Sequence, residues 1–222
     1  MIYSLKPCYC VSLAKRIDYT NVRPNATLRD VEELCREALE LGVRAVCVNP
    51  CYVSYVRKLV GDEILVCAAI DLPFGSSKID IKKRAVEEAV ADGADEVDYV
   101  VNIGMLKSGF LDYIAQEAHE VLEGANGRVV KAIIETGYLT VEEMESVAVR
   151  LGEVGVHYVK TCTGYGPRGV TIEDVLILKR ALKGRAGVKA AGGIRDPKMA
   201  RALIEAGADI IGTSDARRLL RL

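Results

Sequence analysis

The chain has 222 residues, and half of them are hydrophobic, so it is long enough to bury a sizeable core. Its 30 Lys and Arg residues nearly balance 31 Asp and Glu residues, which gives a net charge of −1 at pH 7. With no charged tail or basic stripe, nucleic acid and membrane surfaces are not expected as partners. The apolar runs are shorter than the roughly 18 to 20 residues that cross a bilayer, and no signal-peptide core is present at the start. We therefore expect a cytoplasmic protein.

The cysteines do not form a metal-binding pattern. Seven cysteines and two histidines show no paired Cys-x-x-Cys spacing, which argues against a closed zinc site. Most of the thiols are expected to be small core side chains. An intracellular disulfide that involves Cys8 or Cys10 stays open as an alternative.

A glycine that ends a helix and leads into an apolar run recurs four times along the chain. These glycines are Gly42, Gly93, Gly155 and Gly207, at spacings of 51, 62 and 52 residues. Each suits the left-handed position that closes a helix, and each spacing is close to two strand–helix units of roughly 25 to 30 residues. Four pairs make eight units. The repeat therefore predicts an α/β fold, a (β/α)8 TIM barrel in one domain over residues 1–222.

The predicted strands are short apolar runs rich in β-branched residues, as parallel strands covered by helices should be. We expect them at Ala14–Tyr19, Ala45–Asn49, Ile64–Ile70, Glu96–Asn102, Val129–Glu135, Tyr158–Thr163, Val188–Ala191 and Ile210–Gly212. Amphipathic helices lie between them, and Thr27, Thr140 and Thr171 each stand three residues before a carboxylate, which predicts capping boxes. An open doubly wound sheet is the alternative. The regular pairs, and the lack of Gly-x-Gly-x-x-Gly after the first strand, favour closure.

Three of the predicted strands carry a lysine inside an apolar run. Lys131, Lys160 and Lys189 follow one another at 29 residues each time, which is about one strand, loop and helix. We therefore expect them at one level on successive strands, with Asp98 on the strand before. Helices cover the outside of a barrel, so the cluster should lie inside it, at the mouth. A purely structural ion network is the alternative.

Such a cluster suits amine catalysis. A lysine attacks a carbonyl only as the free amine, and its ordinary pKa near 10.4 leaves little free amine at neutral pH. A second ammonium nearby penalises the charged form and lowers the pKa. Because Lys160 lies between two lysine-bearing strands, we interpret it as the nucleophile, while Asp98 can move protons.

Glycine clusters follow the last three predicted strands. They comprise Gly164, Gly166 and Gly169, then Gly192 and Gly193, then Gly212-Thr213-Ser214. Barrels often bind phosphate in the loops after the last two strands, and glycine lets backbone amides approach a ligand closely. These loops predict a phosphate site, with simple tight turns as the alternative.

Taken together, these segments resemble the deoxyribose-phosphate aldolases, class I (Schiff-base) aldolases on a (β/α)8 barrel. The resemblance runs nearly end to end, through motifs that are each weak but specific as an ordered set. The motifs are Ile17-Asp18-Tyr19-Thr20, Val46-Cys47-Val48-Asn49-Pro50, Gly93-Ala94-Asp95-Glu96-Val97-Asp98, Asn102-Ile103-Gly104, Ile134-Glu135-Thr136, Val159-Lys160-Thr161-x-Thr163-Gly164, Val188-Lys189-x₂-Gly192-Gly193-Ile194-Arg195 and Gly212-Thr213-Ser214.

The resemblance implies that Lys160 forms the Schiff base and that Lys189 and Asp98 are the acid/base pair. It implies a substrate pocket formed by Asp18, Thr20, Cys47, Lys131, Thr163, Gly164, Gly192, Gly193, Gly212 and Ser214. The implied reaction is reversible cleavage of 2-deoxyribose 5-phosphate to acetaldehyde and glyceraldehyde 3-phosphate, without metal or cofactor, in a homodimer or homotetramer. The alternatives are another Schiff-base or transaldolase-like enzyme, and a non-catalytic barrel that binds a sugar phosphate.

Three positions depart from the family pattern. Cys162 replaces a usual serine, and Tyr165 stands where phenylalanine or a basic residue is common. Asp215 replaces a second serine beside the phosphate loop, where an anion should repel phosphate. We expect Asp215 to cap the terminal helix Ala216–Leu222 instead, with Arg217 or Arg218 compensating its charge.

Overall fold

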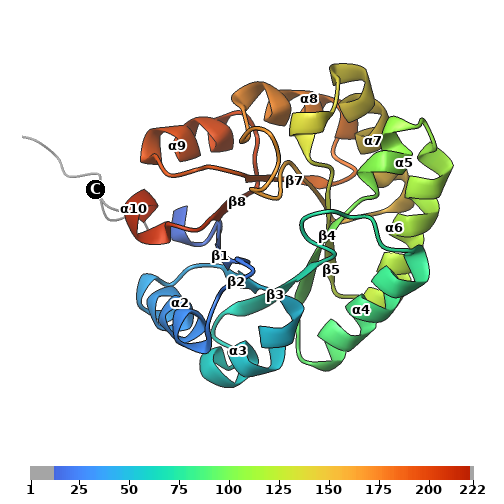
Figure 1. Cartoon of the computed structure of the whole chain (residues 1–222). Coiled ribbons are helices and arrows are strands. Elements are labelled where there is room, and N and C mark those ends of the chain that lie inside the picture. The colour runs from blue at the N-terminus through green and yellow to red at the C-terminus, as the bar shows by residue number, and fades with distance from the viewer. Residues whose placement is uncertain (1–12, 221–222) are drawn as a thin grey trace, which may run out of the picture.

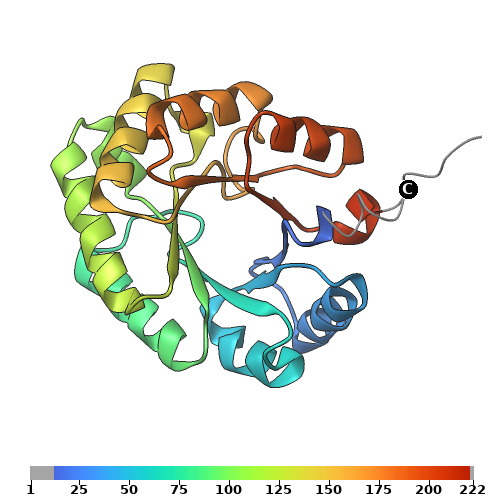
Figure 2. The same cartoon turned by 180° about the vertical axis from the view of Figure 1, so that it is seen from behind.

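Eight parallel strands close into a barrel in chain order in the computed structural model, which describes residues 13–220. The strands are β1 (Ile17–Asn21), β2 (Ala45–Val48), β3 (Leu65–Ile70), β4 (Glu96–Val100), β5 (Val129–Ile133), β6 (Tyr158–Lys160), β7 (Gly187–Ala191) and β8 (Ile210–Thr213). Strand β1 pairs with β8 and completes the ring, and helices surround the strands in both axial views (Figures 1 and 2). The predicted (β/α)8 barrel is confirmed.

The helices begin and end where local sequence signals place them. They are α2 (Leu28–Leu41), α3 (Val53–Val60), α4 (Ile79–Ala91), α5 (Ile103–Lys107), α6 (Leu111–Ala125), α7 (Val141–Val154), α8 (Ile172–Leu182), α9 (Pro197–Glu205) and α10 (Ala216–Leu220), with short 3-10 turns η1 (Pro50–Tyr52) and η2 (Thr136–Tyr138). Capping boxes are present at Thr27, Thr140 and Thr171, as predicted. Between residues 13 and 220, no helix combines the length and the apolar character needed to cross a membrane.

The repeated glycines occupy the left-handed region of backbone space. Gly42 and Gly155 are the C-caps of α2 and α7. Gly93 and Gly207 have φ values of 101° and 110° one residue beyond the caps of α4 and α9. A side chain at these φ values would be strained, so each glycine lets the chain leave a helix and enter the next strand.

Several strand limits predicted from the apolar runs were wrong at the mouth of the barrel. The ends of β4, β5 and β6 lie at Val100, Ile133 and Lys160, two or three residues before the predicted ends. Asn102 instead caps α5, and Glu135 turns the chain with a φ of 52°. Apolar composition does not separate the end of a strand from the buried loop that follows it. At the other side of the barrel, β1 begins later than predicted and runs to Asn21.

Alternate strand residues face opposite sides of the barrel wall, as period-two geometry requires. In β4, Val97 and Tyr99 belong to the apolar core between strands and helices. Asp98, between them, is buried among charged side chains inside the barrel. Lys160 pairs in register with Lys189. Lys131 lies opposite Tyr158, two residues before Lys160, so the three lysines are not all in one hydrogen-bonding register.

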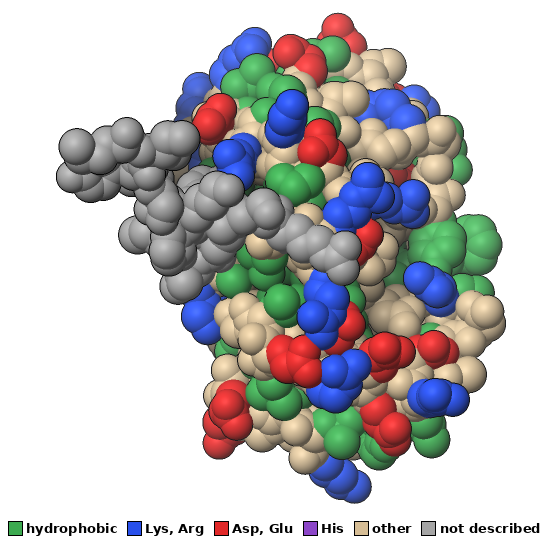
Figure 3. Space-filling view, turned by 90° about the vertical axis from the view of Figure 1, so that its left-hand side faces the viewer, with side chains coloured by type: hydrophobic (Ala, Val, Ile, Leu, Met, Phe, Trp, Pro, Cys, Tyr) green, Lys and Arg blue, Asp and Glu red, His purple; other side chains and the backbone are tan. Residues whose placement is uncertain are grey.

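One face of the molecule carries charges of both signs, in keeping with the near-zero net charge. In Figure 3, Lys and Arg side chains are interspersed with Asp and Glu side chains, and neither sign covers the face. The charges that organise the molecule lie inside it.

Candidate active site

Asp98, in the middle of β4, is the centre of a buried cluster of lysines. Its Oδ1 accepts a hydrogen bond from Lys131 Nζ at 2.8 Å. Its Oδ2 accepts from Lys160 Nζ at 2.8 Å and from Lys189 Nζ at 2.6 Å. All four side chains are buried, and Lys160, at 3%, has the largest exposed fraction. The fold therefore brings together the four charged residues that the sequence singled out, from four successive strands.

A second layer of charge lies beside this cluster. Asp18 Oδ2 accepts from Lys189 Nζ at 2.5 Å, and Asp18 Oδ1 from Arg44 Nη1 at 2.7 Å. Glu96 pairs with Lys131 at 2.7 Å and with Arg44. Sequence reasoning missed Arg44 and Glu96. A signal existed for Glu96, because it stands two residues before Asp98 on the same strand and so shares its face.

The carboxylates offset the crowding of cations that the sequence predicted. Burial raises the pKa of Asp98, but Lys131, Lys160 and Lys189 outweigh burial and hold that pKa well below its usual range. Burial also raises the pKa of Asp18, but the positive charges of Lys189, Lys131 and Arg44 outweigh burial and lower that pKa to about 2.

The same ion pairs act on the two flanking lysines. Burial lowers the pKa of Lys131 and Lys189, yet Asp98 and Asp18 raise both values above the ordinary 10.5. At neutral pH, therefore, Asp98 is ionised and both flanking lysines are protonated.

Lys160 differs from its neighbours because it reaches a cavity. A cavity of about 240 Å³ opens at the mouth between the loops that follow β1, β6, β7 and β8. Among the residues predicted to bind substrate, its lining includes Thr20, Thr163, Gly164, Gly192, Gly193, Gly212 and Ser214, together with Lys160. Asp18, Cys47 and Lys131 do not line it; they are fully buried. Of the lysines within residues 13–220, only Lys160 lines this cavity.

Unpaired peptide N–H groups in the cavity wall indicate what kind of ligand the cavity can hold. Within the described residues, the amides of Gly164, Gly193 and Ser214 donate to no protein acceptor, and all three residues line the cavity. Unpaired peptide N–H groups at such concave sites bind anions. The guanidinium-bearing residues Arg23 and Arg195 also line it. Sequence reasoning gave neither arginine a role, and Arg23 carries no motif that could have identified it.

Asp215 caps a helix. Its Oδ1 accepts a hydrogen bond from the backbone N–H of Arg218 at 3.2 Å, which caps α10, as predicted. Compensation by Arg217 was wrong, because its guanidinium binds Glu37 at 2.7 Å and Glu40 at 2.5 Å on α2. The final two residues of the predicted terminal helix lie outside the described residues.

Two thiols lie below the cavity. Cys67 Sγ is 3.1 Å from Asp98 Oδ1 and 3.4 Å from Lys131 Nζ, and a hydrogen bond with Cys67 lowers the pKa of Cys47 against the effect of burial. The sulfurs and the Asp98 carboxylate lie within 4.8 Å of one another, but the Lys131 ammonium already supplies the positive charge there. The five described cysteines are free thiols, while Cys8 and Cys10 lie outside the described residues.

Known proteins resemble this chain in both sequence and fold. The family model described as DeoC/LacD family aldolase matches residues 13–217. A deoxyribose-phosphate aldolase of Dictyoglomus turgidum is 47% identical over 203 residues, covering 91% of this chain and 93% of that protein. Another, of Thermococcus gammatolerans, is 43% identical over 215 residues, covering 95% of this chain and 96% of that protein.

Solved structures agree with these relatives. An aldolase called QR15 superposes with a TM-score of 0.91 at 39% identity, over 94% of each chain. A deoxyribose phosphate aldolase of Aeropyrum pernix, described as a unique tetrameric structure, superposes with a TM-score of 0.87 at 32% identity, over 95% of this chain and 90% of that one. The charged barrel interior described above thus belongs to a member of the DeoC/LacD family of aldolases.

Proposed function

We propose that this protein catalyses the reversible cleavage of 2-deoxy-D-ribose 5-phosphate to acetaldehyde and D-glyceraldehyde 3-phosphate, through an imine on Lys160. One observation carries the assignment of residues: a single amine, bonded to Asp98, reaches from the buried cluster into a cavity with free peptide N–H groups. Membership of an aldolase family, and the name shared by relatives at 40–47% identity, support the reaction and the substrate.

Imine formation begins the reaction. The Lys160 amine adds to C1 of the open-chain sugar phosphate, and loss of water gives a protonated imine. The adjacent Asp98 carboxylate, 2.8 Å from Lys160 Nζ, stabilises this cation. Because Lys131 and Lys189 are held as cations, Asp98 enters the reaction ionised and is able to accept a proton.

Cleavage follows from the imine. A proton leaves the C3 hydroxyl, the C2–C3 bond breaks, and its electron pair forms an enamine with the imine carbon, which releases glyceraldehyde 3-phosphate. Protonation of C2 and hydrolysis then release acetaldehyde and restore the amine. Asp98 and Lys189, joined at 2.6 Å, form the pair that takes and returns these protons.

The substrate phosphate occupies the far side of the cavity. The amides of Gly164, Gly193 and Ser214 donate to it, and Arg23 and Arg195 supply positive charge. Gly192 and Gly212 keep the wall thin: a Cβ at these positions would come within 2.8 Å of Cys162 and 2.9 Å of Ala191.

Borohydride trapping tests the proposal. Reduction in the presence of acetaldehyde should give a stable adduct on Lys160, and Lys160→Leu should abolish it. An adduct with dihydroxyacetone but not with acetaldehyde would favour a different Schiff-base or transaldolase-like enzyme. No adduct with either carbonyl compound, together with retained phosphate binding, would leave a non-catalytic binding barrel.

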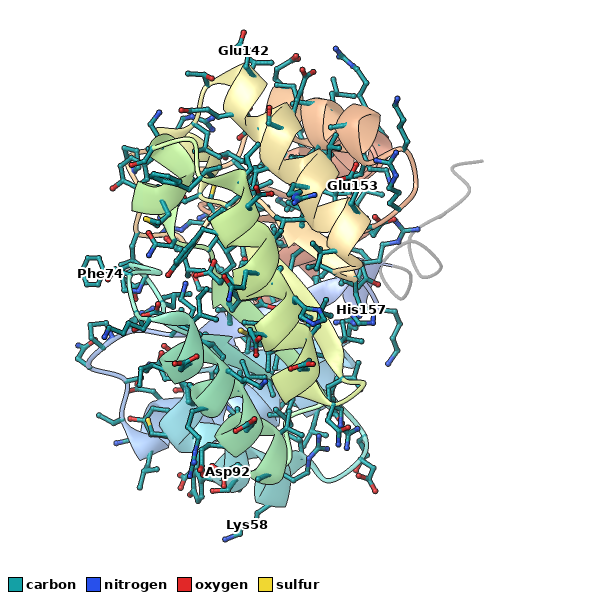
Figure 4. The ribbon with its side chains drawn as sticks, turned by 90° about the vertical axis from the view of Figure 1, so that its right-hand side faces the viewer. Lys58, Phe74, Asp92, Glu142, Glu153 and His157 are labelled. Carbon is teal, nitrogen blue, oxygen red and sulfur yellow. The ribbon has the colours of Figure 1, made fainter. Side chains whose placement is uncertain are left out.

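We also propose a homodimer or homotetramer acting in the cytoplasm as a single catalytic domain. Large apolar side chains at the surface support self-association. Phe74, which is 77% exposed, projects from the body of the molecule in Figure 4, and the Aeropyrum pernix relative is described as a tetramer. The free thiols are consistent with a reducing compartment. Light scattering of the purified protein would measure the assembly, and a monomer mass would contradict this part.

A further inference from the structure

Glu135, two residues after the end of β5, combines two unfavourable features. Its backbone has a φ of 52°, a left-handed conformation that is strained for a residue with a side chain. Only 1% of the residue is exposed, and its Oε1 oxygen has no hydrogen-bond partner within residues 13–220. Such features persist where the surrounding structure imposes them, and they concentrate at functional sites. Glu135 is the middle residue of the Ile134-Glu135-Thr136 motif.

The strain arises because the segment after β5 turns at Glu135 alongside the strand that carries Lys160. Ile134 N donates to Lys160 O at 3.0 Å, and Thr136 N donates to Thr161 O at 2.9 Å. In a regular parallel ladder, N–H groups two residues apart reach carbonyls two residues apart. Here the carbonyls are neighbours, so the chain must contract at Glu135, and the contraction aims its side chain under the loop after β6.

The carboxylate holds the start of that loop. Glu135 Oε2 accepts from Thr163 N at 3.0 Å and also from the Thr163 hydroxyl. The hydroxyl oxygen in turn accepts from Tyr165 N at 3.0 Å. Gly166 covers the carboxylate, and a Cβ there would lie 2.6 Å from Oε1. One buried side chain therefore fixes both residues that flank Gly164.

The other end of the loop is fastened across the mouth of the barrel. Tyr165 Oη donates to Val22 O at 3.0 Å, in the loop after β1. Gly164 lies between the two attachments, with a φ of 93°, and it lines the cavity. Its N–H group has no acceptor in the described part of the chain. The loop is thus held so that one amide is left available.

We propose that Glu135 is a positioning residue for the substrate phosphate. Its carboxylate fixes the Thr163-Gly164-Tyr165 turn and so preorganises the Gly164 amide to donate to that phosphate. The role rests on the proposed function for the identity of the ligand. The neighbouring group of Thr136, Arg168 and Asp174 is different, because Asp174 is paired at both oxygens, by Arg168 at 2.6 and 2.9 Å, and is not part of the cavity wall.

Two substitutions of Glu135 distinguish the loss of its bond to Thr163 from the loss of its charge. Glu135→Asn keeps a residue that tolerates the left-handed conformation but is one methylene too short to hold Thr163. Glu135→Gln keeps the length and one acceptor oxygen. The control is Lys183→Asn, which changes another left-handed residue, with a φ of 49°, at the C-cap of α8.

The test compares 2-deoxyribose 5-phosphate with unphosphorylated 2-deoxyribose. For Glu135→Asn, we expect KM for the phosphorylated substrate to rise about tenfold with kcat nearly unchanged, as for loss of one good hydrogen bond. Activity on unphosphorylated deoxyribose should stay within about twofold. Glu135→Gln and Lys183→Asn should resemble the wild type. Equal losses on both substrates, no loss on either, or a Gln variant as impaired as the Asn variant would each overturn the proposal.

Two further measurements keep the test independent of folding and of the reaction. If Glu135→Asn does not fold, Gly166→Ala, which presses on the carboxylate, should show the same difference between substrates. Calorimetry with inorganic phosphate needs no turnover: about tenfold weaker binding by Glu135→Asn supports the proposal even if wild-type cleavage fails, and unchanged binding contradicts it.

Discussion

Two buried lysines, Lys160 in β6 and Lys82 in α4, have opposite surroundings. Lys82 Nζ bonds Gly75 O at 2.8 Å, Val100 O at 2.7 Å and Glu117 Oε1 at 2.5 Å, between α4 and α6. Its three N–H donors are thereby used. Lys160 makes one such bond, to a carboxylate that two other lysines share, and its remaining side faces the cavity. Burial of a lysine therefore does not by itself indicate catalysis.

The carboxylate partners differ in the same way. Burial raises the pKa of Glu117, and the single Lys82 ammonium offsets this only in part. Burial also acts on Asp98, but three ammonium groups overcome it and lower the pKa. Lys82 and Glu117 join two helices in a buried pair, whereas Asp98 shares its charge with three lysines and is held ionised beside the one that lines the cavity.

Removing the reactive amine should have the largest effect. Lys160→Leu should lower kcat at least about a thousandfold, because no other lysine within residues 13–220 lines the cavity to form the imine. Stability should change little, since Asp98 keeps two ammonium partners. Steady-state cleavage and chemical denaturation measure the two quantities. Turnover retained by Lys160→Leu would show that Lys160, like Lys82, is not needed for catalysis.

Removing a flanking lysine should have a smaller effect on rate. Lys189→Leu should lower kcat roughly a hundredfold by removing half of the proton-transfer pair, and should move the pH–rate profile to higher pH because one cation near Lys160 is gone. Kinetics across a pH range provide the measurement. A profile that neither falls nor moves would argue against coupling between the two residues.

Removing the structural lysine should affect stability and leave catalysis intact. Lys82→Met should cost about 3 to 5 kcal/mol of unfolding free energy, because Glu117 and two carbonyl oxygens lose a buried cation. Below its lowered melting temperature, the variant should keep the wild-type kcat. Urea denaturation and kinetics on the same preparation test this, and a selective loss of kcat at full stability would be the contrary result.

Acid should act on the cluster before it acts on the helix pair. The pKa of Asp18 in the folded state is about 2 against an ordinary 3.8, so its stabilising effect is complete above about pH 4 and is lost as the pH falls toward 2. The shift corresponds to roughly 2 kcal/mol. The raised pKa of Glu117 has the opposite sign, since its protonation favours the folded state. Denaturation at several pH values should show a smaller acid loss in Asp18→Asn than in the wild type.

The regular features of the fold were predictable because they depend on local chemistry. The capping threonines, the helix-ending glycines and the apolar strands each follow from neighbours along the chain, and their repetition was enough to predict a closed barrel. Lys160, Lys189 and Asp98 were identifiable because a charge inside a covered strand has no route to solvent. Asp215 was assigned to a helix cap on the same kind of local argument, and the structure places it there.

Features that depend on contacts between residues distant in the sequence could not be predicted from local patterns. Arg44 and Glu96 join the cluster through partners far along the chain. Arg217 binds Glu37 and Glu40 on α2 rather than its neighbour Asp215. Lys82 resembled any lysine on a helix until packing buried it against α6. Glu135 carried no local sign that β5 turns there.

The sequence by itself determined the order of strands and helices, the barrel they form and the identity of the charged strand residues, because period, capping and burial act over a few residues. Only the tertiary structure decided which charges neutralise one another and which lysine of the buried cluster lines the cavity. Those outcomes depend on distances of a few ångströms between side chains from different strands, where Coulomb energies change steeply and no local pattern records them.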